Sequence, residues 1–273
     1  MPSIITSRTA VHHIGTGSLL VDGLLSGGWL RGSICEIWGG PGTGKTTLAQ
    51  HCLDDLDPDE NALWVSVGSE VPHRSINASV VAPRSAEDAF GAITAALYLG
   101  AALVVVDSAN GLVRAVELEE DSTYVPSPHR EFKPELDELR HACEVTNGTV
   151  LFLSKPRDTE RAPIRGTGVS EKAKQRVSLK IVRSHQNGDV VVEASVKSGD
   201  YVEYTLRPGS GIDWAEEILV VCVEHDIVAV EGSWYFVRDR KVQGKAEMLR
   251  RIRTDPNLAA YLAAEARRAL DIE

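Results

Sequence analysis

Cysteine is scarce in this sequence, and its few occurrences are placed where neither a disulfide framework nor a zinc site is expected. The four cysteines, at positions 35, 52, 143 and 222, are far apart in the 273 residues and form no CxxC pair. Three of them lie inside apolar segments, where a thiol packs as a small hydrophobic side chain. We therefore expect buried thiols in a protein of a reducing compartment.

Long hydrophobic runs are missing as well. The longest uncharged stretch, residues 91–106, is shorter than the roughly 18 residues of a membrane-spanning helix, and Gly100 divides it. Residues 1–13 contain no apolar core of the length that a secretory signal needs. Together these absences predict a soluble, cytoplasmic protein.

Positive charge is in deficit, with 29 Lys and Arg residues against 39 Asp and Glu residues and a net charge of −10. This balance argues against a uniformly basic nucleic-acid binder, but it leaves room for a local basic groove on an acidic body. The hydrophobic fraction of 43% is ordinary for a globular protein, so an ordered core is expected.

Short apolar runs alternate with helical patterns, which is typical of a mostly parallel sheet covered by helices. We expect strands at residues 33–38, 62–67, 101–106, 149–154, 177–182, 190–196 and 201–206. Three intervening helices are predicted from the apolar faces Leu48, Cys52 and Leu53; Ala89, Phe90, Ile93 and Leu97; and Leu136, Leu139 and Cys143. Ser85 and Asp88 fit a capping box for the second helix, and Pro134 fits the first position of the third.

The pattern changes near residues 209–211, which suggests an N-terminal arm (1–11), a core (12–210) and a small C-terminal domain (211–273). The last part indicates a helix at 215–225, a hairpin around 231–232 and two further helices. Asp255 and Pro256 open the final helix. The predicted fold class is therefore α/β, with a mostly parallel twisted sheet and a small α+β domain appended.

A glycine-rich segment fits the pattern G-x-x-x-x-G-K-[ST], in which each position serves triphosphate binding. It comprises Gly39, Gly40, Pro41, Gly42, Thr43, Gly44, Lys45, Thr46 and Thr47. Glycines let backbone N–H groups turn toward phosphates at the positive end of a helix dipole. Lys45 would reach the β- and γ-phosphates, and the Thr46 hydroxyl would complete a Mg²⁺ shell. Because the segment follows an expected strand and opens an amphipathic helix, we interpret it as a phosphate-binding loop and not as an accidental glycine-rich turn. We therefore predict ATP and Mg²⁺ as cofactors.

Two carboxylates at strand ends extend this site. Asp107 ends the buried strand at 101–106, and in P-loop proteins such an aspartate holds Mg²⁺, usually through water. Glu70 follows the strand at 62–67, where a carboxylate can orient or deprotonate the attacking water. From position alone, a surface glutamate explains Glu70 equally well. His13, His73, His129 and His141 share no ligand spacing, so no metal beyond Mg²⁺ is expected.

Nucleic-acid contacts are expected in two irregular loops and in the tail. The loop at 156–170 carries Arg157, Arg161, Ile164, Arg165 and Gly166, and Lys172, Lys174 and Arg176 follow in a helix expected to be capped by Ser170. Cations, a helix N-terminus and one apolar wedge suit a phosphate backbone with spread bases, although a solvated loop remains the alternative. The loop at 119–130 offers Tyr124 and Val125 as base contacts. Residues 238–253 hold seven basic residues against two acidic ones.

Four stretches resemble the bacterial RecA recombinase family, and together they extend over nearly the whole chain. GTGSLLVDGLLSGGWLRGSICEIWG is similar to the segment leading into that family's phosphate loop, and VVVDSANGL to its magnesium-binding strand. LFLSKPR resembles the strand before its second DNA loop. GSWYFVRDRKVQGKAEML resembles its C-terminal signature through Gly232, Trp234, Tyr235, Gln243, Gly244 and Lys245.

The resemblance implies a RecA-like P-loop core, with Glu70 as the water-activating carboxylate and Lys155 at the place of the family's phosphate-sensing glutamine. It further implies that the two loops hold single-stranded DNA, that Arg130 contacts a phosphate, and that the C-terminal domain captures double-stranded DNA. Helical filaments on DNA, with ATP between neighbouring subunits, are implied as well.

The chain departs from the family pattern in four ways. The family's N-terminal docking helix is expected to be missing, which leaves residues 1–11 as the candidate polymerising strand. Lys155 offers a point charge where the family has a two-sided amide. Lys197 alone stands near the place of the paired lysines that complete the neighbour's ATP site. The helix after Glu70 is shorter, which leaves His73 and Arg74 as alternatives for covering the adenine base.

These residues favour a compact DNA-dependent ATPase and recombinase, of the kind that a phage genome encodes. It would bind single-stranded DNA and promote pairing with homologous duplex in DNA recombination and repair. The alternative is a RecA-like accessory scaffold, for example one that recruits a translesion polymerase, with little strand exchange. Retention of Glu70, the charged second loop and the basic tail favours the recombinase, because a scaffold has no need of a complete ATP site.

Overall fold

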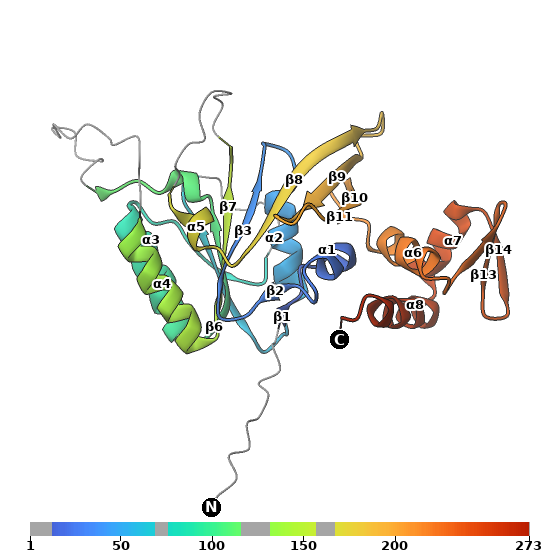
Figure 1. Ribbon diagram of the computed structural model, residues 1–273, viewed down its shortest axis with the longest axis horizontal. Coiled ribbons are helices and arrows are strands. Elements are labelled where there is room, and N and C mark those ends of the chain that lie inside the picture. The colour runs from blue at the N-terminus through green and yellow to red at the C-terminus, as the bar shows by residue number, and fades with distance from the viewer. Residues whose placement is uncertain (1–12, 69–75, 116–131, 157–166, 273) are drawn as a thin grey trace, which may run out of the picture.

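The computed structural model describes residues 13–68, 76–115, 132–156 and 167–272 as a large sheet with helices on both faces, followed by a smaller C-terminal lobe (Figure 1). None of the helices in these ranges combines the length and the hydropathy that a bilayer span requires. All four cysteines lie in the described part of the chain as buried free thiols, which confirms the predicted burial of these side chains.

Within the described ranges, nine strands form the large sheet, in the spatial order β11-β10-β9-β8-β3-β7-β6-β4-β5. They are β3 (Ile34–Gly39), β4 (Asn61–Ser66), β5 (Ser79–Val81), β6 (Ala101–Asp107), β7 (Thr149–Ser154), β8 (Gln175–Ser184), β9 (Val190–Ser195), β10 (Tyr201–Arg207) and β11 (Gly211–Ile212). Neighbours are parallel from β5 across to β8 and antiparallel from β8 to β11. The predicted α/β fold with a mostly parallel sheet is confirmed, and every predicted strand is present.

Side chains of the central strands alternate between two apolar cores, one on each face of the sheet. In β6, Leu103 and Val105 enter the first core, whereas Val104 and Val106 enter the second. The first core packs on α1 (Leu19–Leu24) and α2 (Lys45–Asp54), and the second on α3 (Ala86–Tyr98) and α4 (Lys133–Thr146). Burial on both faces explains why the central strands appear in the sequence as continuous apolar runs.

Capping residues begin the helices where the sequence predicts them. The Ser85 hydroxyl accepts a hydrogen bond from the Asp88 N–H at 3.1 Å and begins α3. The Asp255 carboxylate accepts from the N–H groups of Asn257 and Leu258, each at 3.1 Å, and begins α8 (Pro256–Ala269). Helix α4 begins one residue before Pro134, which therefore occupies the second helical position.

The prediction of a helix from Ser170 through Arg176 is wrong. Only a single turn forms, α5 (Val169–Lys172), and its N-cap is Gly168 at φ 84°, not Ser170. The Lys174 N–H donates to the Ile34 carbonyl at 2.8 Å, and the chain then continues as β8, parallel to β3. Sheet pairing with a distant strand thus ends the helix where local pattern extends it.

The shortest strands escape prediction from sequence. They are β1 (His13–Ile14), β2 (Trp29–Leu30), β5, β11 and β14 (Arg240–Gln243), each two to four residues long. So few residues carry too little alternation to separate a strand from a loop. The predicted C-terminal hairpin is present as β12 (Ala229–Glu231) and β13 (Trp234–Val237), and β14 pairs with β13 to make three strands.

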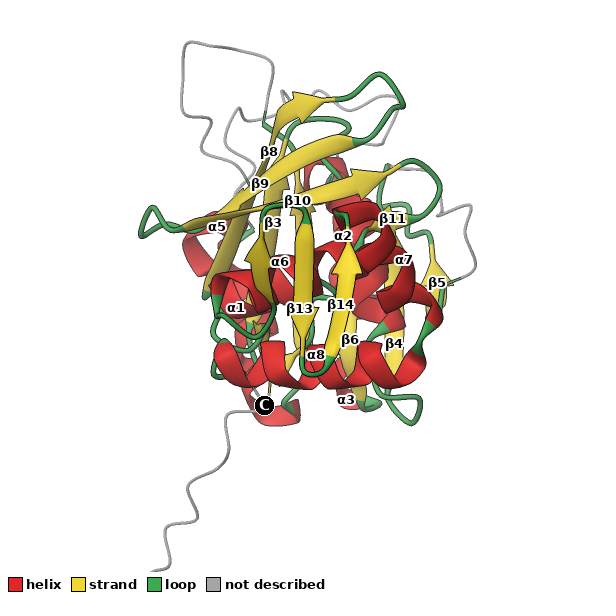
Figure 2. Cartoon of the chain, turned by 90° about the vertical axis from the view of Figure 1, so that its right-hand side faces the viewer, coloured by secondary structure: helices red, strands yellow, loops and turns green. Residues whose placement is uncertain are grey.

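The C-terminal lobe consists of α6 (Trp214–Glu224), the three-stranded sheet, α7 (Lys245–Thr254) and α8. Figure 2 looks onto this lobe, whose strands β13 and β14 lie in front of the large sheet. Its apolar residues join the same core as those of α1. Because Gly211 and Ile212 still pair with β10, we propose that the lobe begins at Asp213.

A buried carboxyl group joins the lobe to the core. Glu217 on α6 is 2% exposed, and its carboxyl oxygens accept hydrogen bonds from the Ser18 hydroxyl at 2.5 Å and the Leu19 N–H at 2.9 Å. Ser18 is also the N-cap of α1. Burial raises the pKa of Glu217 to about 8, against the lowering effect of these two hydrogen bonds. This junction is therefore sensitive to pH.

Replacing Glu217 with glutamine is expected to reduce the pH dependence of folding stability. The folded-state pKa of about 8 lies above the ordinary value of 4.5, so the contribution of this group is full below 4.5 and is lost as pH rises toward 8. Within that window the folded state binds one proton more than the unfolded state, so the free energy of unfolding falls by about 1.4 kcal/mol for each pH unit of increase. Denaturant unfolding of the wild type and the variant, measured across the window, checks this. Glu224→Gln, an exposed position on the same helix, is the control, and an unchanged slope in Glu217→Gln would contradict the assignment.

Candidate nucleotide-binding site

The glycine-rich segment forms the corner between β3 and α2, as the sequence predicts. Strand β3 ends at Gly39, and α2 begins at Lys45 with Gly44 as its N-cap. Gly42 and Gly44 have φ values of 74° and 87°, a backbone conformation that side-chain-bearing residues rarely adopt. The first N–H groups of α2 are therefore presented at a loop that can follow a chain of phosphates.

The Lys45 ammonium group lies folded against this loop. Its Nζ donates to the carbonyl oxygens of Gly39 at 2.7 Å and Gly40 at 2.6 Å, and the residue is 6% exposed. Burial, and then the charge of Lys155, lower the pKa of Lys45 to about 8, while Asp107 acts in the opposite direction. The ammonium is thus held at the loop by two neutral carbonyl groups. An anionic oxygen can take their place, because it is a stronger hydrogen-bond partner for an ammonium group.

Thr46 and Asp107 are brought together from positions 61 residues apart. The Thr46 hydroxyl donates to Asp107 Oδ2 at 3.1 Å, at the carboxyl end of β6. Burial raises the pKa of Asp107, whereas the Thr46 hydrogen bond and the charges of Lys155 and Lys45 lower it. The peptide bond between Asp107 and Ser108 is cis.

This hydroxyl–carboxylate pair suits a hard divalent cation. Mg²⁺ prefers oxygen ligands, and it usually takes one or two from the protein and the rest from phosphates and water. Among the described residues, no group of three or more His, Cys, Asp or Glu side chains is arranged to hold a metal ion. The donor set of Thr46 and Asp107 therefore fits magnesium bound together with a phosphate ligand, and not a metal cage built by the protein alone.

Lys155 is held at the same edge of the sheet by a residue that sequence reasoning missed. The Asn110 side chain accepts a hydrogen bond from the Lys155 N–H at 2.7 Å and donates to the Lys155 carbonyl at 3.1 Å. This two-sided contact fixes the backbone just after β7 beside the segment that follows β6. The charge of Lys155 acts on the pKa values of both Lys45 and Asp107, which places it within electrostatic reach of the phosphate loop.

A cavity of about 400 Å³ continues from the phosphate loop along the sheet edge. Gly42, Thr47 and Gln50 line one side, and the β10–β11 turn at 206–211 lines the other. The lining is largely apolar, with Val190, Leu206 and several glycines among its residues. The sequence gives no signal for this cavity, because its two sides are more than 150 positions apart along the chain.

Several predicted site residues lie outside the described residues. They are Glu70, Arg130, Arg157, Arg161, Ile164, Arg165 and Gly166, together with the base-covering candidates His73 and Arg74. Their roles stay predictions.

Three of the predicted DNA-binding cations, Lys172, Lys174 and Arg176, lie in the described part of the chain, and Lys172 and Arg176 have acidic partners. Lys172 Nζ contacts Asp137 Oδ1 at 2.5 Å. Arg176 Nε lies 2.6 Å from Oε2 of the buried Glu36, and its guanidinium lies over the Trp38 ring at 5.3 Å. The positive charge that each offers to a phosphate is therefore partly offset.

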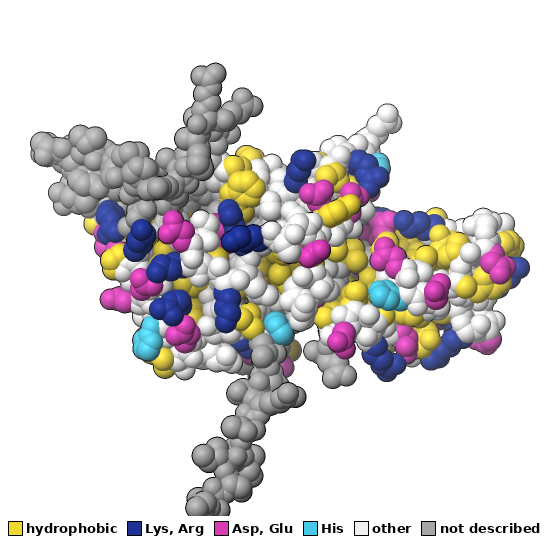
Figure 3. All heavy atoms as spheres, viewed as in Figure 1, with side chains coloured by type: hydrophobic (Ala, Val, Ile, Leu, Met, Phe, Trp, Pro, Cys, Tyr) yellow, Lys and Arg dark blue, Asp and Glu magenta, His cyan; other side chains and the backbone are white. Residues whose placement is uncertain are grey.

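The basic tail is also less free than its composition suggests. Arg238 lies over the Tyr261 ring and Lys241 over the Trp234 ring, and the other five cations have carboxylate partners: Arg240 with Asp255, Lys245 with Glu216, Arg250 and Arg251 with Glu247, and Arg253 with Asp213. On the face drawn in Figure 3, basic and acidic side chains are interspersed. The described side chains drawn on this face form no continuous basic stripe.

The sheet order, the phosphate-type loop and the Thr46–Asp107 pair define a RecA-like P-loop fold. No protein-family model matches the chain. The chain is 26% identical to Protein RecA of Dichelobacter nodosus, in an alignment that covers 94% of this chain and 82% of that protein. It is 27% identical to Protein RecA of Chlorobium limicola, covering 90% and 79%, and 27% identical to that of Levilactobacillus brevis, covering 97% and 79%. This likeness over nearly the whole length supports a RecA-like protein.

Proposed function

We propose that this chain is a DNA-dependent ATPase of the RecA type, which binds single-stranded DNA and promotes its pairing with homologous duplex. The observation that carries the proposal is the convergence of Lys45, Thr46 and Asp107 on one corner of the sheet. The likeness to RecA proteins over more than nine-tenths of the chain supports it. Recombination and repair of DNA are the processes that such an activity serves.

Each residue of the corner has a role in this proposal. Lys45 exchanges its two carbonyl partners for β- and γ-phosphate oxygens, and the N–H groups of the loop bind the same phosphates. Thr46 and Asp107 hold Mg²⁺, which when bound neutralises charge on the phosphates. Lys155, fixed by Asn110, supplies a further positive charge toward the γ-phosphate. Glu70 is proposed from the sequence alone as the residue that orients the attacking water.

The nucleoside half of ATP is proposed to lie in the cavity beside Thr47. Gly42 and Thr47 of the phosphate loop line the cavity, and its volume of about 400 Å³ suits a base with its ribose. Its glycine and aliphatic lining residues suit the apolar faces of an aromatic base. This places the base against the β10–β11 turn instead of against His73 or Arg74.

DNA is proposed to bind at the loops that follow β6 and β7, whose strand ends carry Asp107 and Lys155. In parallel sheets, ligands bind at the carboxyl ends of the strands, so nucleotide and DNA would share this edge. Arg130, Arg157, Arg161 and Arg165 are the proposed phosphate contacts. Assembly into filaments is proposed to use residues 1–11.

The proposal is tested by measuring ATP hydrolysis with and without single-stranded DNA, in parallel with electron microscopy in the presence of a non-hydrolysable ATP analogue. A sharp rise in hydrolysis on adding DNA, together with helical filaments, is the expected result. Monomers whose ATPase is indifferent to DNA would contradict the proposal and indicate a RecA-like scaffold.

A further inference from the structure

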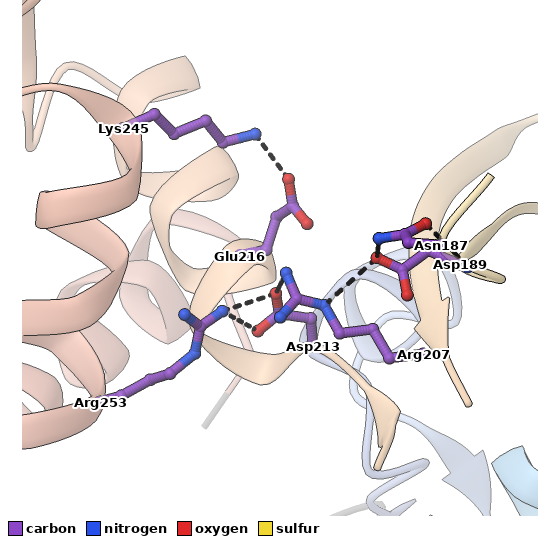
Figure 4. A network of polar contacts seen from close by, with 7 residues as sticks. All are labelled: Asn187, Asp189, Arg207, Asp213, Glu216, Lys245 and Arg253. Carbon is purple, nitrogen blue, oxygen red and sulfur yellow. Dashed lines mark hydrogen bonds and ion pairs between the residues drawn. The ribbon is translucent and has the colours of Figure 1, made fainter. Parts of the chain in front are cut away.

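A second buried carboxylate, besides Glu217, lies where the large sheet meets the C-terminal lobe. Asp213, the N-cap of α6, is 6% exposed and binds two arginines (Figure 4). Arg253 on α7 donates to both of its oxygens, at 2.8 and 2.7 Å. Arg207, at the end of β10, approaches the same carboxylate with Nη2 at 2.7 Å from Oδ2. The two guanidinium groups therefore share one negative charge.

Arg207 is also part of the wall of the proposed nucleoside cavity. Its Nε atom is buried and has no hydrogen-bond partner within the described ranges. It forms a long ion pair with Asp189 Oδ2 at 3.9 Å, too far for a hydrogen bond, and that oxygen accepts a hydrogen bond from the Asn187 amide at 2.9 Å (Figure 4). Arg207 therefore lines the cavity with a guanidinium group whose Nε–H makes no hydrogen bond within the described ranges.

The segment between Arg207 and Asp213 is tied to the phosphate-loop helix. His51 on α2 accepts a hydrogen bond through Nε2 from the Ile212 N–H at 3.1 Å. A Cβ atom on Gly211 would lie 2.2 Å from that nitrogen, so the turn packs directly on the helix. Asp213 is consequently held at a fixed place relative to Lys45 and Thr46.

On the other side, Asp213 is linked to the body of the lobe. Arg253 lies on α7, and α7 is bound a second time to α6 through Lys245 Nζ and Glu216 Oε1 at 2.5 Å (Figure 4). The Arg253 side chain can keep both contacts to Asp213 only while α7 stays seated against α6. The packing of α7 on α6 within the lobe thereby determines how much of the Asp213 charge remains for Arg207.

We propose that Asp213 is a positioning residue for the nucleoside half of the bound nucleotide. It holds Arg207 along the cavity, where the guanidinium donates to an acceptor atom of the base or ribose. By sharing the carboxylate with Arg253, it makes nucleoside binding depend on the C-terminal lobe. Coupling of this kind is reciprocal, so a nucleoside in the cavity stabilises the packing of α7 on α6 in turn. The inference rests on the proposed function only in that a nucleotide fills the cavity.

The test compares two ligands by calorimetric titration in the presence of Mg²⁺: ATP, and inorganic tripolyphosphate, which lacks a nucleoside. Asp213→Asn is expected to weaken ATP binding about tenfold, since loss of one well-placed charged contact is worth about 1.4 kcal/mol or more. Tripolyphosphate binding is expected to stay at the wild-type value. Arg253→Gln is expected to change the affinity for ATP and to leave the affinity for tripolyphosphate unchanged. This variant alters how Asp213 is shared between the two arginines, and Arg253 does not line the cavity.

Arg250→Gln is the matched control, because Arg250 lies on the same helix as Arg253 and its side chain pairs, among the described residues, only with the half-exposed Glu247. The inference is overturned if Asp213→Asn weakens the affinity for both ligands equally, or if the ratio of the two affinities does not change. Either result leaves the proposed function standing. Failure of the wild type to bind either ligand overturns both. If Asp213→Asn does not fold, Arg207→Gln, which keeps the aliphatic stem, carries the same expectation and the same contrary result.

Discussion

Replacing Lys45 with alanine is expected to weaken Mg²⁺–ATP binding by at least about 100-fold. The ammonium makes two hydrogen bonds to the loop, at 2.7 and 2.6 Å, and these are the contacts that phosphate oxygens would replace. Charge-assisted hydrogen bonds are worth about 1.5–3 kcal/mol each, so loss of two accounts for that factor. Calorimetric titration with a non-hydrolysable ATP analogue measures the effect directly.

The same titration repeated at different pH values separates charge from packing. The pKa of Lys45 is lowered to about 8, chiefly by burial, so the free protein loses this positive charge as pH rises through that value. Wild-type affinity is expected to fall above about pH 8, whereas the residual affinity of Lys45→Ala is expected to lack that fall. Lys180→Ala, an exposed position on β8, is the control. If Lys45→Ala binds ATP within threefold of the wild-type affinity, a difference of only ~0.7 kcal/mol, Lys45 does not belong to the site.

Replacing Glu70 with glutamine is expected to lower the turnover of ATP by roughly 100-fold or more while leaving ATP binding unchanged. The amide keeps the size of the side chain but accepts no proton from the attacking water. Because the binding contacts belong to Lys45, Thr46 and the loop, the effect should fall on kcat and not on affinity. Phosphate release at saturating ATP measures it, in the wild type and in the variant.

Glu138→Gln, at an exposed position on α4, serves as the control for changing one surface charge. Turnover of Glu70→Gln equal to that of the control would assign Glu70 to the surface, which is the other interpretation of its position. A parallel loss of affinity and turnover would instead indicate that Glu70 acts on the shape of the site.

The sequence predicts the elements whose residues carry a strong local pattern. Strands β6 and β7 are buried on every residue and appear as unbroken apolar runs. The phosphate loop and Asp107 were found because the chemistry of a triphosphate and a hard cation restricts which residues serve. Edge strands such as β5 and β11 are two or three residues long and carry no comparable pattern.

What the sequence could not provide are pairings between distant residues. Asn110 meets Lys155 across 45 positions, and Asp213 meets Arg253 across 40. Neither contact follows from a motif, because each depends on how the sheet edges and the lobe are packed. Arg176 shows the opposite error: counted in the sequence as a free cation on a helix, it lies in β8 beside the buried Glu36. Counting charges therefore overstates the basic surface that a nucleic acid could meet.

The most direct test of a nucleotide site coupled to a nucleic-acid site is the binding of a labelled single-stranded oligonucleotide with and without a non-hydrolysable ATP analogue, both with Mg²⁺. Affinity for the oligonucleotide is expected to rise at least about tenfold when the analogue is bound, a coupling free energy of about 1.4 kcal/mol. Equal affinity in the two conditions would contradict it.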